Sequence, residues 1–194
     1  MNGAPYFNNA GIFLIQTAFG FYILALLLRF LLQWVRADFY NPLVQFLVRV
    51  TNPPLIPLRR SIPGLFGLDL ACLLLMLALQ IIEWLLVLNL GGLPSNPFGV
   101  LVLALAELLG LTLQVFLWAV IIQALMSWFV RDPRNPLYGV LYRLTAPVLR
   151  PVQRVLPLFG GVDLSPLIAL VVLQLMHMLL IAPIRDLGFA LLRS

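Results

Sequence analysis

The sequence predicts an all-α membrane protein with four transmembrane helices, in two parallel helix–loop–helix repeats with short amphipathic cytoplasmic helices in the loops. Its composition supports this class, because 62% of its 194 residues are hydrophobic and only 10% are charged. A soluble domain of this size needs more polar residues to cover its surface. Two further observations, an internal repeat and a positive charge confined to two loops, predict the arrangement.

The repeat emerges when the chain is shifted by 94 positions, which gives 16 identities between residues 34–70 and residues 128–164. Most identities are Trp, Asp, Asn, Pro, Arg, Thr or Gly, so chance matching of apolar residues does not explain them. The repeat predicts one unit used twice, over residues 1–97 and 98–194. Its signature residues are Trp34, Asp38, Asn41, Pro42, Arg49, Thr51, Pro53, Arg60 and Asp69, and then Trp128, Asp132, Asn135, Pro136, Arg143, Thr145, Pro147, Arg154 and Asp163.

Four apolar segments, roughly residues 11–34, 69–90, 98–129 and 164–183, are long enough to cross about 30 Å of hydrocarbon at about 1.5 Å per residue. A short uncharged turn with Gly and Pro joins the second to the third, which predicts a tight antiparallel hairpin. Arg29 lies near the end of the first segment, and its side chain is expected to extend to the lipid headgroups.

Every basic residue is Arg, and the net charge of +5 lies in loops 36–69 (+2) and 131–163 (+3). Both loops fall on the same side of the membrane, because two spans separate them. The positive-inside rule predicts that this side is the cytoplasm and that both termini lie outside. Each repeat has two spans, so the repeats are expected to be related by a pseudo-two-fold axis along the membrane normal.

Each loop contains a helix start. The dipeptide Asn-Pro, at residues 41–42 and 135–136, combines an N-cap residue with Pro at the first helical position. Apolar residues then recur at helical spacing, which predicts a short helix that lies in the interface or packs under the bundle. Prolines soon after Thr51 and Thr145 predict that this helix ends there and that a second short basic segment follows.

The acidic residues of the loops have structural and functional interpretations. Asp38 and Asp132 either form ion pairs with Arg49 and Arg143 that fold the loops, or contact a partner or an ion. The aspartates that precede the second and fourth spans, at positions 69 and 163, are expected to be N-caps, where their charge also favours the helix N-terminus.

Four loop arginines are candidate contact residues: Arg59, Arg60, Arg150 and Arg154. They either set the topology and bind the anionic headgroups of the lipid bilayer, or bind a cytoplasmic protein partner. Nucleic acid is not an expected partner, because the sequence contains no recognition module.

Polar residues inside the second and fourth spans are related by the repeat. Gln80 corresponds to Gln174, and Glu83, on the same helical face, corresponds to His177. A Glu within a span is costly and marks a functional site by default. These four residues are expected to face each other, either as a hydrogen-bonded clasp between the two spans or as an ion or proton site. Glu107 is a second intramembrane acid without a polar counterpart.

The sequence offers no pattern of an enzyme, a cofactor site or a metal site. There is no Ser/His/Asp set, no phosphate-binding Gly loop and no zinc spacing. The single His cannot supply two haem ligands, and the lone Cys72 excludes an internal disulfide. We therefore expect no catalytic residue, cofactor or bound metal.

The twice-occurring pattern Trp-x3-Asp-x2-Asn-Pro, Arg-x-Thr-x-Pro, Pro-x2-Arg-x2-Pro and Gly-x-Asp-Leu resembles the YggT (YlmG) family of bacterial and plastid membrane proteins. The resemblance covers nearly the whole chain and implies a small multi-pass protein of the bacterial inner membrane. Members are linked to osmotic tolerance and potassium or ion homeostasis, to septum-formation genes, and in plastids to cytochrome b6 cofactor assembly and nucleoid distribution. The second copy departs from the pattern at residues 133–134 and at Val148, so the two loops are not expected to act equally.

The leading functional hypothesis is potassium or proton homeostasis under osmotic stress, as a channel, carrier or regulator. Four helices leave little room for a pore, so conduction would require a homo-oligomer. The alternative is a membrane interaction protein that docks cell-division, envelope or cofactor-assembly partners through its basic loops.

Overall fold

Four helical segments are long and apolar enough to cross a membrane in the computed structural model, which describes residues 4–62, 64, 68–129, 135–155 and 163–193. They are α1 (Ala4–Trp34), α3 (Leu70–Gly91), α4 (Pro97–Phe129), and a fourth made of α6 (Ser165–Met176), the π-helical turn η1 (His177–Ile181) and α7 (Ala182–Arg193). Only 17–39% of their most apolar windows is buried, so most side chains are free to face lipid. The described residues contain no β-strand, and the predicted all-α membrane class is confirmed.

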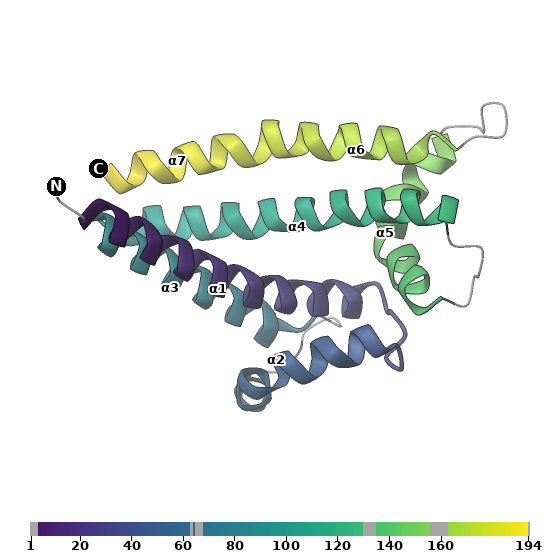
Figure 1. Cartoon of the computed structure of the whole chain (residues 1–194), viewed down its shortest axis with the longest axis horizontal. Helices are drawn as coiled ribbons and strands as arrows, with labels where there is room; N and C mark the ends of the chain where they lie inside the picture. The colour runs from purple at the N-terminus through teal and green to yellow at the C-terminus, as the bar shows by residue number, and fades with distance from the viewer. Residues whose placement is uncertain (1–3, 63, 65–67, 130–134, 156–162, 194) are drawn as a thin grey trace.

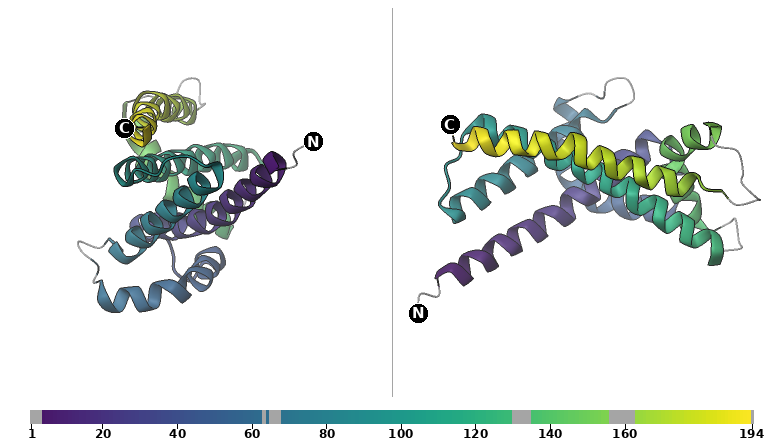
Figure 2. Two further views of the ribbon diagram at one scale, coloured as in Figure 1. Left: turned by 90° about the vertical axis from the view of Figure 1, so that its left-hand side faces the viewer. Right: turned by 90° about the horizontal axis from the view of Figure 1, so that it is seen from above.

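The helix α4 lies in the middle of the bundle (Figure 1). It packs against α3 on one side and against α6 and α7 on the other, and α1 packs mainly against α3. Both termini and the α3–α4 turn lie at one end, which we call the terminal end (Figures 1 and 2). The helices α2 (Pro42–Ser61) and α5 (Pro136–Val155) lie toward the other end, which we call the loop end.

The fourth span continues to Arg193, well beyond the predicted end at residue 183. The N–H of Ala182 donates to the carbonyl of His177, which makes a wider π-helical turn just before Pro183. Because Pro183 has no N–H for the regular helix ladder, the wider turn lets the helix pass it. The predicted end of this span is therefore wrong.

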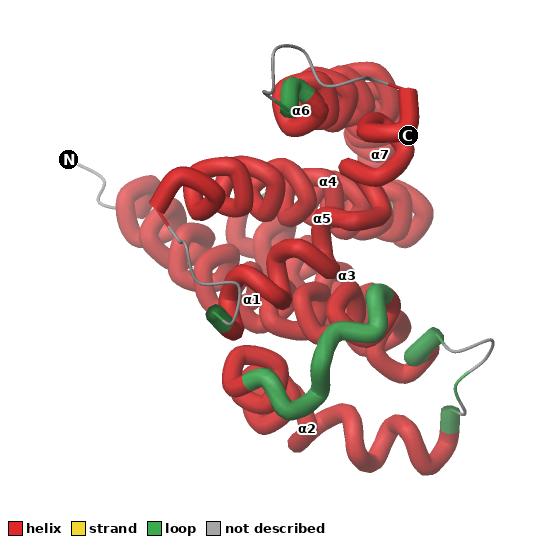
Figure 3. The backbone as a smooth tube through the Cα atoms, turned by 90° about the vertical axis from the view of Figure 1, so that its right-hand side faces the viewer, coloured by secondary structure: helices red, strands yellow, loops and turns green. Residues whose placement is uncertain are grey.

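The helices α2 and α5 each run for 20 residues, although they contain the prolines Pro53, Pro54, Pro57, Pro147 and Pro151. The prediction that each helix ends at its Thr is wrong, because an internal proline removes one hydrogen bond and bends a helix without always ending it. Figure 3, a view from the loop end, shows α2 turning sharply along its length.

The largest apolar core lies toward the loop end, where α2 and α5 pack under the spans. Its buried members include Leu26, Leu55, Met76, Phe116 and Leu144, from five different helices. This burial holds the two amphipathic helices against the bundle.

The helices α4 and α7 approach each other closely at two glycines near the terminal end. A Cβ on Gly99 would lie 2.9 Å from the backbone nitrogen of Leu192, and a Cβ on Gly188 would lie 2.7 Å from the side chain of Leu103. Small residues at such contacts allow membrane helices to pack closely.

Candidate functional site

A polar cavity of about 330 Å³ lies between the membrane-spanning helices. Its polar lining comes from all four spans and consists of Gln16, Gln80, Glu83, Glu107, Gln114, His177 and Arg185. Polar side chains at this depth are expensive, because lipid offers them no hydrogen-bond partners. The cavity is therefore the candidate functional site, and we call it the polar cavity.

The two acids of the polar cavity lie at similar depths. Glu83 is roughly two turns from the end of α3, and Glu107 is roughly three turns from the start of α4, which is about 12–15 Å along each helix. Since both positions are measured from the terminal end and the hydrocarbon is about 30 Å thick, the cavity lies near the middle of the spans.

Glu83 is bonded within its own helix. The Nε2 of Gln80 donates to the Oε2 of Glu83 over 2.9 Å, and Gln80 is only 3% exposed. This bond occupies one carboxylate oxygen and holds the side chain beside the cavity.

Glu107 has a basic neighbour that the sequence analysis missed. The Nη2 of Arg185 lies 3.6 Å from the Oε2 of Glu107, and both side chains are partly exposed. Arg185 was placed outside the span because the helix was expected to end before it. The apolar face that continues through Ile181, Gly188 and Leu192, all buried, was the signal that could have found it.

His177 lines both the polar cavity and a neighbouring cavity of about 260 Å³. It begins the π-helical turn η1, a feature that is frequent at functional sites. Gly110 lies against it, since a Cβ there would be 3.7 Å from the Nε2 of His177. Gln174 lines the neighbouring cavity and not the polar cavity.

The predicted clasp between the second and fourth spans is wrong. The helix α3 packs on α4, and no hydrogen bond joins the described side chains of Glu83 and His177. The second and fourth spans meet nearer the terminal end, where the rings of Trp84 and Phe189 pack edge to face with centroids 5.9 Å apart. The polar cavity is nevertheless lined by Gln80, Glu83, Glu107 and His177.

The predicted N-caps are present. The Oδ1 of Asn41 accepts from the N–H of Leu43 over 3.0 Å, and its Nδ2 donates across to the carbonyl of Pro136 over 2.8 Å. Asn135 accepts from the second residue of α5 over 2.9 Å, and Asp69 accepts from the third residue of α3 over 3.2 Å. These side chains fix the starts of α2, α5 and α3.

Asp163 also bonds the start of its span, with a small difference from the prediction. Its Oδ1 accepts from the N–H of Ser165 over 2.9 Å, while Leu164 occupies the N-cap position. Hydrogen bonds from the side chain and the backbone of Ser165 hold the pKa of Asp163 below its usual value. The Nε2 of Gln153 adds a further hydrogen bond of 2.9 Å.

Thr51 and Thr145 are fully buried and connect the amphipathic helices to the spans. The Nη1 of Arg29 donates to the Oγ1 of Thr51 over 2.6 Å and to the carbonyl of Val48 over 3.3 Å. Arg29 is only 6% exposed, so the prediction that it extends to the headgroups is wrong. In the second copy, Thr145 forms a hydrogen bond with Gln123, and Gln123 is the residue that corresponds to Arg29 in the repeat.

Asp38 does not pair with Arg49. Its Oδ1 instead accepts from the N–H of Tyr40 over 3.0 Å, which makes a local turn after α1. The predicted ion pair in the first loop is therefore wrong, because the nearby backbone satisfies the carboxylate.

In the second loop, Arg143 donates to the backbone carbonyl of Arg36 and so connects the two copies. Its predicted partner Asp132 and the side chain of Trp128 lie outside the described residues. Trp34, the last residue of α1, is 49% exposed.

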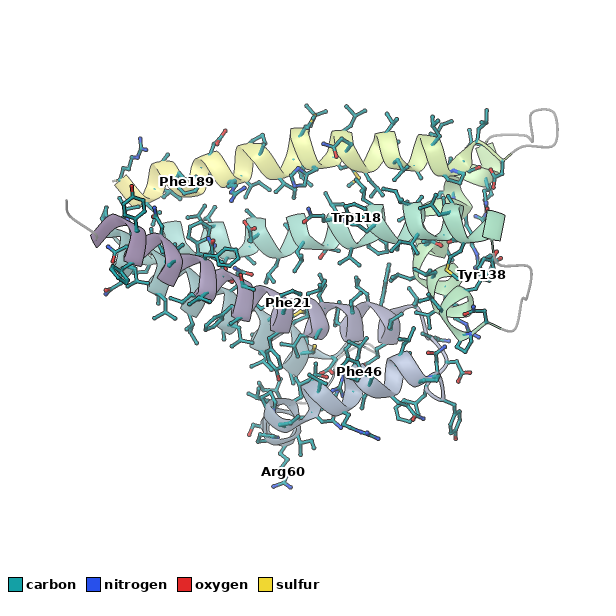
Figure 4. The ribbon with its side chains drawn as sticks, in the orientation of Figure 1. Phe21, Phe46, Arg60, Trp118, Tyr138 and Phe189 are labelled. Atoms are coloured by element: carbon teal, nitrogen blue, oxygen red, sulfur yellow. The ribbon has the colours of Figure 1, made fainter. Side chains whose placement is uncertain are left out.

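The four candidate contact arginines have different surroundings. Arg59 forms an ion pair with Asp69, and Arg60 points away from the bundle (Figure 4). Arg150 and Arg154 line a groove between α1 and α5. The four therefore do not form one surface.

Comparison with known proteins identifies the family. The sequence model of the CCB3/YggT family matches residues 8–90 and again residues 102–184. The uncharacterised protein PA0392 of Pseudomonas aeruginosa is 44% identical over 176 residues, which cover 90% of this chain and 89% of that protein. The uncharacterised protein YggT of Escherichia coli strain K12 is 38% identical over 170 residues, 88% of each chain. No solved structure matches. The chain belongs to the CCB3/YggT family.

Proposed function

We propose that this protein handles potassium ions or protons in ion homeostasis under osmotic stress, and that the polar cavity is the site. The observation that carries the proposal is the grouping of Glu83, Glu107 and His177 around one cavity inside the spans. Ionisable groups at such depth are costly and mark ion or proton pathways. The physiological setting is taken from the family resemblance.

The lining suits a monovalent cation or a proton. Oxygen ligands can replace the hydration shell of a cation, and the cavity offers the carboxylates together with the amides of Gln16 and Gln114. Arg185 balances the charge of Glu107, which leaves Glu83 to hold one positive charge. His177 is the proposed proton carrier, because one nitrogen of a neutral imidazole donates a hydrogen bond and the other accepts one.

We place the protein in the bacterial inner membrane, with the loop end in the cytoplasm, because the excess arginine lies in the two loops. A carrier needs only one chain. A channel would need a homo-oligomer, because the polar cavity is small and lies within a single four-span bundle.

Purified protein in liposomes, assayed for potassium and proton flux, tests the proposal. Wild-type protein is expected to carry one of these fluxes, and Glu83→Gln and His177→Ala are expected to abolish it while the protein stays folded. Asp163→Asn is the matched control, because this acid lies outside the cavity. Absent flux in the wild type, or full flux per folded molecule in Glu83→Gln, would reject the proposal.

The loop end supports a second candidate function, the docking of a protein partner. Phe46 on α2 is 64% exposed and Tyr40 beside α2 is 83% exposed, and Arg60 at the far end of α2 points outward (Figure 4). Exposed aromatic and basic residues of this kind are typical of interaction surfaces. The family resemblance implies cell-division, envelope or cofactor-assembly proteins as partners.

Photo-crosslinking in living cells tests the docking function. A crosslinker at position 46 is expected to capture a discrete protein partner. The same crosslinker at Phe21, which is 71% exposed on the span α1, is the control and should capture lipid. Lipid alone at both positions would exclude partner docking at this surface.

A further inference from the structure

A groove of about 740 Å³ lies between the end of α1 and the helix α5, apart from the polar cavity. We call it the α1–α5 groove. Arg143, Arg150 and Arg154 line it from α5, and Trp34 lines it from α1. The three arginines recur at i, i+7 and i+11, so the helix places them on one face.

No described carboxylate lines the α1–α5 groove. Arg143 donates to the carbonyl of Arg36, and neither Arg150 nor Arg154 forms an ion pair within the described part of the chain. A similar groove beside α2 differs, because Asp69 lines it and pairs with Arg59, one of the three arginines that line it. The α1–α5 groove therefore keeps an excess of positive charge, and clustered guanidinium groups favour an anion with several oxygens.

The position of the groove favours a lipid over a soluble anion. Trp34 is the last residue of a span, and Trp34 and Tyr142 are 49% and 51% exposed. Aromatic side chains at span ends lie at the level of the headgroups. The wall near Gly139 is open, since a Cβ there would meet nothing within 4 Å.

We propose that the α1–α5 groove binds the phosphate of an anionic phospholipid. The guanidinium groups of Arg150 and Arg154 bond to the phosphate oxygens, and Trp34 lies beside the glycerol. The acyl chains lie along the apolar surface of the spans. This site does not depend on the proposed ion function of the polar cavity.

Native mass spectrometry of the full chain, titrated separately with phosphatidylglycerol and phosphatidylcholine, tests the proposal. The wild type is expected to prefer phosphatidylglycerol. Arg150→Gln together with Arg154→Gln is expected to weaken this binding about 30-fold, from the usual contribution of two basic residues beside an acidic headgroup. The matched control is Arg49→Gln with Arg60→Gln, which removes the same charge from α2 outside the groove and should change the affinity about twofold at most.

A second variant keeps the test valid if loss of charge disturbs insertion. Arg150→Lys with Arg154→Lys preserves the charge but removes the planar fork that matches phosphate, so its affinity should fall between those of the wild type and the Gln variant. Unchanged affinity in the Lys variant would reject the site. The site would also be rejected if both Gln variants lost the same affinity for phosphatidylglycerol. It would be rejected as well if glycerol phosphate displaced the lipid with an affinity equal to that of the lipid.

Discussion

The two copies of the loop keep the same contacts but use different chemistry. In the first copy, Thr51 of α2 accepts a hydrogen bond from the guanidinium of Arg29. In the second, Thr145 of α5 is bonded to the neutral amide of Gln123. In the repeat, Arg29 corresponds to Gln123 and Thr51 corresponds to Thr145. What the copies share is therefore the position of the contact and not its charge.

The start of the following span shows the same difference. Arg59 pairs with Asp69 in the first copy, while Gln153 donates to Asp163 in the second. In both cases the first copy has a guanidinium where the second has an amide. Removing the buried partner of a charged group costs more free energy than removing the partner of a neutral group. Substitutions in the first copy should therefore destabilise the protein more than those in the second.

The largest expected effect tests this difference directly. Thr51→Val should lower the free energy of unfolding by about 2–3 kcal/mol, because Arg29 is left with one long bond to Val48, whereas Thr145→Val should cost about 1 kcal/mol for a neutral bond. Reversible unfolding in mixed micelles measures both.

Thr17→Val is the control for this pair, because the hydroxyl of Thr17 bonds only within its own helix, to the carbonyl of Phe13. It should leave the stability nearly unchanged. Equal losses for Thr51→Val and Thr145→Val would show that charge does not distinguish the copies.

The second span of each copy should also differ in its contribution to stability, by a smaller amount. The helix α3 ends at Gly91, whereas its counterpart continues as α7 and packs on Gly99. Gly99→Ala should cost about 1–2 kcal/mol, because the new Cβ meets the backbone of Leu192. Gly20→Ala, which meets nothing within 4 Å, should be neutral or slightly stabilising in the same unfolding assay. A stable Gly99→Ala variant would contradict the close packing of α4 on α7.

The smallest effect concerns pH. Since the pKa of Asp163 is lowered in the folded state, its carboxylate stabilises the protein above the ordinary Asp pKa of about 3.9, and this contribution is lost as the pH falls through the lowered value. Thermal unfolding between pH 6 and pH 3 should therefore show a steeper acid decline for the wild type than for Asp163→Asn. Parallel curves would mean that the bonds to Ser165 do not stabilise the ionised form.

Local chemistry explains what could be predicted of the site and the loops. The side chains of Asn41, Asn135 and Asp69 reach backbone N–H groups only two or three residues away, so the sequence alone identifies them as caps. Arg29 and Arg185 bond to residues of other helices. Their partners could not be predicted, because no local pattern encodes which helix lies beside them.

The amino-acid sequence by itself determined the four spans, the repeat and the starts of the amphipathic helices, because hydropathy and capping act over one helix at a time. Only the tertiary structure decided that α4 packs against both α3 and the last span, and that Glu83 and His177 line one cavity with no hydrogen bond between their described side chains. The physical reason is that lipid covers any apolar helix face equally well. Hydropathy therefore identifies which helices span the membrane, and close packing and polar contacts decide which of them touch.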